Sequence, residues 1–132
     1  MSQAKTQTAA TKGKISQVVI KRMVDEDPDA SYLEQEGMGF EDRLRQYREG
    51  QFCFVGVMAR AEIILPTYKG YSGIAQSITS GGLWGIESDS DAAHFAEIEK
   101  EQLDELADQL HHVGFSRRAI AASFRNIERE EN

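Results

Sequence analysis

The chain has 132 residues, of which 40% are hydrophobic and 28% charged, and its formal net charge is −7. This balance excludes a fully disordered chain and favours one domain with a single hydrophobic core. No stretch approaches the roughly 18 apolar residues of a membrane-spanning helix, and the polar N-terminus lacks the apolar region of a secretory signal. We therefore expect a soluble, cytoplasmic protein.

The negative charge is concentrated in one segment. Nine acids and a single base, Lys100, lie between Glu87 and Asp108, so the rest of the chain is close to neutral. Because phosphates would be repelled there, we do not expect this segment to bind nucleic acid directly.

The first half of the chain predicts a strand followed by helical structure. Residues 1–14 are expected to form a disordered polar arm, and residues 15–132 a single domain. Ile15–Met23 is rich in β-branched residues and predicts a strand. A short helical turn and a helix over Phe40–Glu49 follow, and Gly50 lies just past the end of that helix.

Three strands are predicted next. Phe52–Leu65 is long and apolar, and its neighbours suggest that Cys53, the only cysteine, is buried and inert. Ile74–Ser80 predicts a second strand of this group. Gly81-Gly82 is typical of a two-residue hairpin turn, which would lead into the strand Leu83–Glu87.

Two helices are predicted at the end. A long helix is expected to begin after the capping segment 88–91 and to end near Val113. Its apolar stripe, about 140° wide, contains Ala92, Phe95, Ile98, Leu103, Leu106, Leu110 and Val113. A last helix is predicted from Ser116, and its buried stripe consists of Ile120, Phe124 and Ile127.

The order β–α–β–β–β–α–α predicts an α+β fold, with an antiparallel sheet of about four strands covered by helices on one face. An uncovered edge strand of such a sheet could pair with a second copy, so a homo-oligomer stays open.

The search for catalytic or metal-binding residues finds none. Asp91 with His94 and Asp108 with His111 have ligand-like spacing, but about 25 Å of helix separates the pairs, so they cannot share a metal. We expect these histidines and His112 to lie on the surface. The sequence lacks a nucleophile elbow, a P-loop and a calcium loop. We therefore predict a protein that is not an enzyme, with no catalytic residues, cofactor or metal.

Five carboxylates lie opposite the apolar stripe of the long helix, within about 100° of arc. This acidic ridge consists of Glu97, Glu101, Asp104, Glu105 and Asp108. Like charges four residues apart cost a few tenths of a kcal/mol each, and one acid per roughly 3.3 Å resembles the phosphate spacing of a nucleic-acid strand. We interpret the ridge as a surface for a basic partner; the alternative is an ordinary solvated face.

A second candidate surface surrounds the only tryptophan. Trp84 lies between glycines, with Tyr68 and Tyr71 nearby in sequence, and such aromatic residues dominate binding hot spots. We predict that these three residues, with Glu87 and Asp89, contact a partner. The alternative for Trp84 is a core position over the sheet.

Two polar residues fall inside the apolar stripe of the long helix. Glu99 and Gln102 must find hydrogen bonds there, and Arg60 is a candidate partner.

The block SGGLWGIESDSD, residues 80–91, continued by Glu101–Leu106, resembles a family of small acidic proteins of bacteriophages, prophages and plasmids. No activity is attached to this family, and the resemblance extends from about Phe40 to Phe115. It implies a setting in which such proteins often disable host defences.

From that setting we expect a non-enzymatic inhibitor of a nucleic-acid-targeting defence system, of the anti-CRISPR or anti-restriction type, in the cytoplasm of a bacterial host. Its partner would be a basic host protein or ribonucleoprotein complex, met by the ridge as a nucleic-acid mimic. The alternative is a mobile-element accessory protein that binds nucleic acid or a replication or transcription partner through its scattered arginines and its N-terminal lysine arm.

Overall fold

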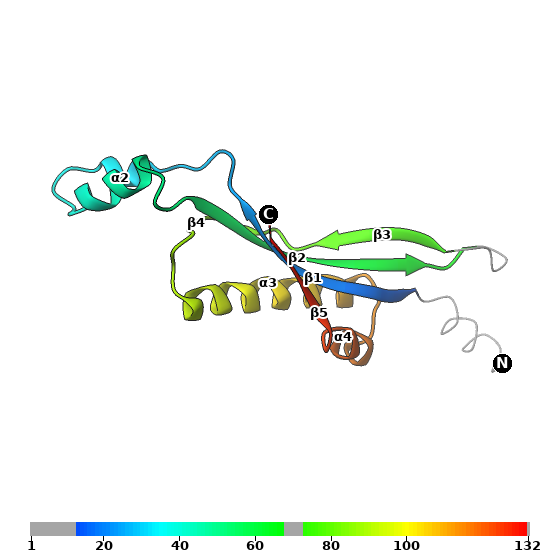
Figure 1. The fold of residues 1–132 in the computed structure, drawn as a ribbon. Coiled ribbons are helices and arrows are strands. Elements are labelled where there is room, and N and C mark those ends of the chain that lie inside the picture. The colour runs from blue at the N-terminus through cyan, green and yellow to red at the C-terminus, as the bar shows by residue number, and fades with distance from the viewer. Residues whose placement is uncertain (1–12, 68–72, 132) are drawn as a thin grey trace, which may run out of the picture.

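The computed structural model describes residues 13–67 and 73–131 and confirms an α+β fold (Figure 1). The predicted strands and helices are present within a few residues of their expected limits, except that the last helix ends at Ser123 and a further strand follows it. The elements are β1 (Lys14–Val24), η1 (Ser31–Glu34), α2 (Glu41–Arg48), β2 (Phe54–Leu65), β3 (Ile74–Thr79), β4 (Leu83–Glu87), α3 (Ala92–His112), α4 (Arg117–Ser123) and β5 (Ile127–Glu131).

The sheet is built around β2. On one side β2 pairs antiparallel with β1, and on the other it pairs with both β3 and β4. β3 follows residues Arg60–Leu65 of β2, whereas β4 follows Phe54–Val57. The predicted hairpin at Gly81-Gly82 is therefore wrong. β3 and β4 lie one after the other along the same edge of β2, and the glycines form a break between them.

A fifth strand replaces the end of the predicted last helix. α4 stops at Ser123, and Ile127–Glu131 pairs in parallel with Val18–Arg22 of β1. Ile127 still packs against the core, as its apolar character indicated, but it does so from a strand. The free edge of β1 supplies hydrogen bonds that local sequence does not reveal, and the sheet is consequently mixed.

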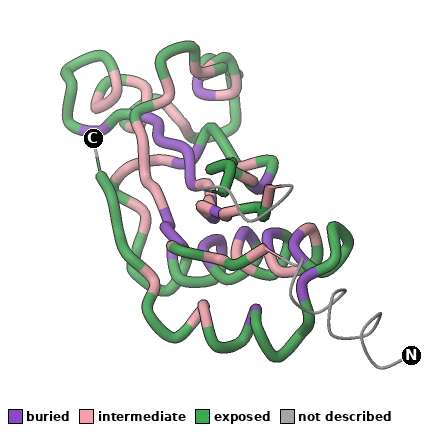
Figure 2. The backbone as a smooth tube through the Cα atoms, turned by 90° about the vertical axis from the view of Figure 1, so that its right-hand side faces the viewer, coloured by how far each residue is buried: buried purple, intermediate pink, exposed green. Residues whose placement is uncertain are grey.

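The main core lies between one face of the sheet and the helices. Alternate residues of β2, such as Val57 and Ala59, point toward α3 and are fully buried. α3 and α4 cover this face, and Figure 2 shows the buried residues concentrated where α3 meets the sheet. No helix from residues 13–67 or 73–131 covers the other face. The sheet's two edges are β5 and the broken β3–β4 edge.

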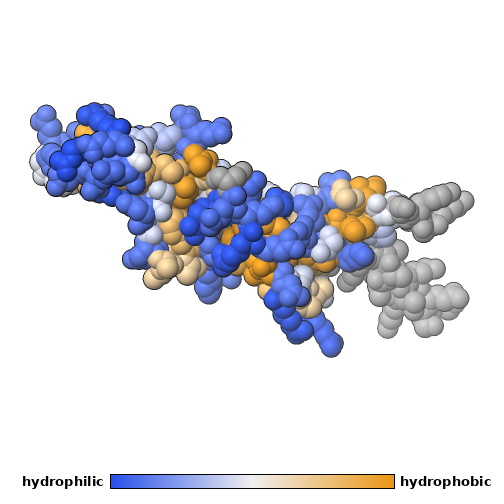
Figure 3. Space-filling view, viewed as in Figure 1, coloured by the Kyte–Doolittle hydropathy of each residue, from blue (hydrophilic) through white to orange (hydrophobic). Residues whose placement is uncertain are grey.

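A second, smaller core lies at one end of the sheet. Leu33, Phe52 and Phe54 are buried there among partly buried aromatic and aliphatic residues from η1 and α2. Figure 1 shows this η1–α2 unit extending past the sheet, and Figure 3 shows its surface to be mainly hydrophilic. Cys53 lies between the two buried phenylalanines but is exposed, because side chains alternate in extended backbone. The prediction of a buried Cys53 is wrong.

Candidate partner-binding surface

Trp84 is presented on the sheet face that the helices leave uncovered. The residue is 45% exposed, and its six-membered ring lies against the backbone of Gly56, where a Cβ would clash with the indole. The pairing register shifts between Val55 and Val57, and Gly85 adopts a φ of 76°. This irregularity redirects β4 so that Ile86 enters the core while Trp84 covers Gly56. Trp84 is thus both packed and accessible.

Buried hydrogen bonds fix the break that precedes Trp84. The Ser80 hydroxyl donates to Gln102 Oε1 at 2.6 Å, and the Gly82 amide donates to the same oxygen at 2.9 Å. Ser80 Oγ also accepts from the Ala59 amide at 2.9 Å. Glu105 accepts from the Gly81 amide at 3.2 Å. Through these contacts α3 holds the edge of the sheet that carries Trp84.

The prediction that Glu99 and Gln102 require hydrogen bonds is confirmed, but the predicted partner is wrong. Glu99 accepts from Arg129 of β5 at 2.7 Å and lies 3.7 Å from Arg22 of β1. Arg60 is on the opposite face of the sheet, where it pairs with Glu62 and Glu130. The error follows from the missed strand, because β5 brings the actual partner of Glu99.

The acidic ridge on α3 is only partly neutralised. All five carboxylates are on exposed residues, and two of them form ion pairs within the chain: Asp104 with Lys100 at 2.7 Å and Asp108 with Arg117 at 3.3 Å. The hydrogen bond to Asp104 raises the pKa of Lys100. Glu97 and Glu101 make no hydrogen bond or ion pair with the residues that the structure describes. These two remain available to a basic partner.

Glu87 and Asp89 are occupied by contacts within the chain. Arg43 of α2 donates to Glu87 at 2.5 Å and to Asp89 at 2.8 Å, and its guanidinium lies 3.8 Å from the centre of the Phe52 ring. The Tyr32 hydroxyl donates to Glu87. These contacts attach the η1–α2 unit to the end of β4. We therefore leave both acids out of the binding surface, although the sequence placed them in it.

The same cluster changes three pKa values. The hydrogen bond from Arg43 lowers the pKa of Asp89, and the two carboxylates raise the pKa of Arg43 above its usual range. Burial, then the hydrogen bond to Glu87, raises the pKa of Tyr32 to about 12. The cluster therefore stabilises the charged arginine and the protonated phenol, which is the arrangement of a structural clamp.

The remaining predicted residues add little to this surface. Tyr68 and Tyr71 lie outside the described residues. His94, His111 and His112 are exposed, as expected.

Within residues 13–67 and 73–131, no group of three or more metal-ligating side chains could hold an ion. In the same segments, no helix has the length and apolar character required to cross a bilayer.

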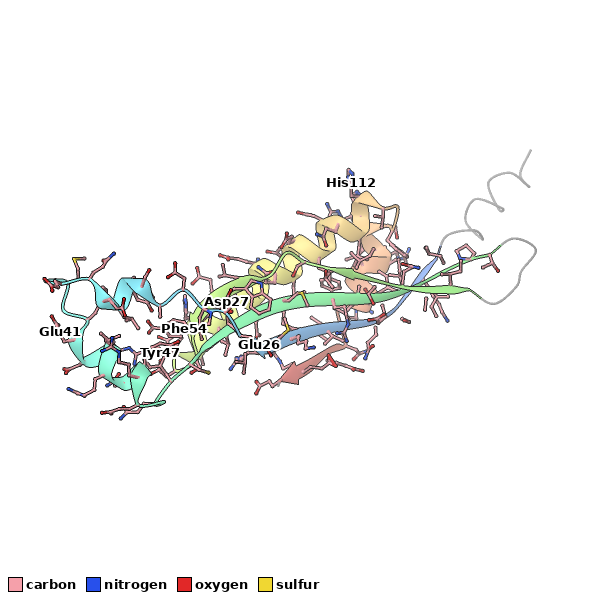
Figure 4. The ribbon with its side chains drawn as sticks, turned by 90° about the horizontal axis from the view of Figure 1, so that it is seen from above. Glu26, Asp27, Glu41, Tyr47, Phe54 and His112 are labelled. Atoms are coloured by element: carbon pink, nitrogen blue, oxygen red, sulfur yellow. The ribbon has the colours of Figure 1, made fainter. Side chains whose placement is uncertain are left out.

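The sequence reasoning missed a cleft beside Trp84. This Trp84 cleft has a volume of about 640 Å³ and is lined by Trp84, Met23, Val24 and the segment Asp25–Asp27. Figure 4 shows Glu26 and Asp27 where the chain leaves β1 for the η1–α2 unit, close to Phe54. In the sequence, this run of acids before Pro28 indicates only the end of a strand. Its position opposite Trp84 depends on the pairing of Met23 with Gly56.

Comparisons with protein-family profiles, with curated proteins and with solved structures found no match. The fold and site define an α+β protein whose only tryptophan is half-exposed and whose longest helix carries carboxylates without partners among the described residues.

Proposed function

We propose that this chain is a non-enzymatic binding protein that contacts a basic partner through Trp84 and the unpaired acids of α3. The observation that carries the proposal is the rigid presentation of Trp84. Hydrogen bonds that Gln102 accepts from Ser80 and Gly82 fix the approach to β4, yet Trp84 stays 45% exposed. Exposed aromatic anchors on rigid scaffolds are typical of binding hot spots.

The charge of α3 supports a cationic partner. Glu97 and Glu101 are one helical turn apart and repel one another, which costs a few tenths of a kcal/mol in the free protein. A partner that brings lysine or arginine to this turn would remove the repulsion. Glu105 extends the acidic surface to the break before Trp84, because it hydrogen-bonds to Gly81. Because Trp84 lies on the opposite face of the sheet from α3, a partner would reach around the β3–β4 edge to contact both parts of the surface.

The resemblance of residues 40–115 to proteins of mobile elements supplies the proposed setting. The partner would be a basic protein or ribonucleoprotein of a nucleic-acid-targeting defence system in the cytoplasm of a bacterial host. The chain would inhibit that system by occupying a surface that otherwise holds nucleic acid.

Affinity purification from bacterial lysate, followed by mass spectrometry, tests this proposal. The wild type is compared with the Glu97→Lys/Glu101→Lys variant and with a matched control, Glu41→Lys/Glu49→Lys, whose exposed acids lie at the two ends of α2. We expect the control to retain a basic partner and the α3 variant to lose it. If both variants retain the same partners as the wild type, the acidic surface has no binding role.

One observation favours the alternative, a mobile-element accessory protein that binds nucleic acid. Arg118 and Arg125 are exposed and make no ion pair with any described residue. Binding through this surface should weaken on Arg118→Ala/Arg125→Ala, and it should strengthen on the α3 charge reversal. An oligonucleotide titration at two salt concentrations therefore separates the two functions.

A further inference from the structure

The Trp84 cleft has a fixed, largely apolar wall. One side is the Trp84 ring, which Gly56 and the Gln102 hydrogen bonds hold in place. The neighbouring wall comes from the end of β1, where Val24 is 48% exposed. An accessible aromatic wall of this kind accepts a flat or elongated side chain without rearrangement.

The other wall of the cleft is acidic. The Asp25 amide donates to the Phe54 carbonyl at 2.8 Å, and the Asp25 carboxylate accepts from the Asp27 amide at 3.1 Å, so the segment is tied to β2. None of Asp25, Glu26 and Asp27 forms an ion pair with the described residues, and no arginine or lysine among those residues lines the cleft. The charge therefore complements a cation.

Elsewhere in the protein, the chain's own arginines occupy sites that combine an aromatic ring with carboxylates. Arg43 lies over the ring of Phe52 while it pairs with two carboxylates. Arg22 likewise lies 3.8 Å from the centre of the Phe95 ring and contacts Glu99. The Trp84 cleft repeats the combination of an aromatic ring and carboxylates, and no cation from the described residues lines it.

We propose that the Trp84 cleft binds an arginine side chain in a basic segment of a partner protein. A guanidinium stacks on an indole and donates paired hydrogen bonds to carboxylates, whereas the phosphates of a nucleic acid would be repelled by the acidic wall. The inference deepens the proposed function, on which it rests for the existence of a protein partner. The cleft itself can be tested without that partner.

Trp84 is the only tryptophan, so its fluorescence reports directly on the cleft. The full chain is titrated with the end-blocked peptide Gly-Arg-Gly and with Gly-citrulline-Gly, in which a neutral urea replaces the guanidinium. We expect a saturable change in emission with the arginine peptide, and about tenfold weaker binding of the citrulline peptide. Equal binding of the two peptides, or no change with either, would overturn the assignment.

Neutralising variants locate the binding. Asp25→Asn/Glu26→Gln/Asp27→Asn should weaken the arginine peptide about tenfold, whereas Glu34→Gln/Glu41→Gln/Glu49→Gln, which removes three charges from the η1–α2 unit, should change it less than twofold. Equal losses in both variants would contradict a site at the cleft. If the Asp25→Asn/Glu26→Gln/Asp27→Asn variant does not fold, the salt dependence of peptide binding to the wild type provides the test. The affinity of the wild type for the arginine peptide should fall as ionic strength rises, and salt-independent binding overturns the proposal.

The outcome is separable from that of the proposed function. Selective arginine binding with no partner captured from lysate would retain the cleft assignment and remove the defence-inhibitor proposal. Partner capture that depends on Glu97 and Glu101, together with no arginine binding, would do the reverse.

Discussion

Gly56→Ala should displace Trp84 and destabilise the protein. Gly56 does not require a left-handed backbone, so alanine fits the strand, but its Cβ would clash with three carbons of the indole. With 45% of Trp84 exposed, roughly 140 Å² of a side chain of about 250 Å² is covered. At about 25 cal/mol per Å² the burial of the ring against all its neighbours is worth about 3.5 kcal/mol. Because the ring can shift rather than detach, we expect a loss of about 1–3 kcal/mol.

Urea unfolding and tryptophan emission measure this effect. Gly56→Ala should lower the unfolding free energy and shift native emission to longer wavelength, as the ring becomes more hydrated. In a Trp84→Phe background the smaller ring should reduce the cost, and in a Trp84→Ala background the cost should vanish, because alanine then meets no indole. An equal loss in the Trp84→Ala background would refute the contact between Gly56 and Trp84.

Three further predictions concern the groups that support this surface. Gln102→Ala leaves the Ser80 hydroxyl and the Gly82 amide without their shared acceptor, so urea unfolding should show a loss of about 2–3 kcal/mol. The control is Gln109→Ala, which should cost clearly less, because the buried oxygen of Gln109 has no partner among the described residues. Glu99→Gln removes the charge that lies between Arg22 and Arg129 and should lower the unfolding free energy by about 1–2 kcal/mol. This is less than for a fully buried ion pair, because both arginines are partly exposed. Hydrogen exchange should then accelerate in β5 more than in β3, and unchanged exchange in β5 would contradict the role of this ion pair. The pKa of Tyr32 is raised from 10.0 to about 12. Its protonated form therefore stabilises the fold fully below about pH 10, and this stabilisation is lost as the pH rises to 12. Tyr32→Phe should abolish about 1 kcal/mol of this alkaline loss of unfolding free energy, a figure reduced for solvent screening, and identical pH profiles of stability for the two proteins would exclude the effect.

The fold was largely predictable where local patterns and tertiary packing agree. The apolar stripe of α3 and its capping residue Asp91 define that helix, and Asp91 does accept from the His94 amide. The strand β2 was evident from its long apolar run. The prediction of strand partners was weaker, because Gly81-Gly82 has the composition of a hairpin turn but serves as a break along one edge.

The candidate site was only partly predictable, since charge and exposure depend on distant partners. Glu97 and Glu101 were expected to project outward and they are exposed without partners among the described residues. Glu87 looked equivalent in sequence, yet Arg43, 44 residues earlier, pairs with it. The acids at 25–27 carried no sign of a site, because their relation to Trp84 arises only from the pairing of β1 with β2.

By itself, the amino-acid sequence determined most of the helices and strands, although not β5. It also determined which residues of α3 face the core, and that Glu99 and Gln102 need polar partners. These properties follow from the periodicity of apolar residues and from the cost of burying an unsatisfied polar group. Only the tertiary structure decided which carboxylates stay unpaired, that Ile127 enters a parallel strand, and that Trp84 lies over Gly56 beside an acidic wall. Each of these depends on contacts between segments far apart in the chain, whose register is set by the assembled sheet and not by local sequence.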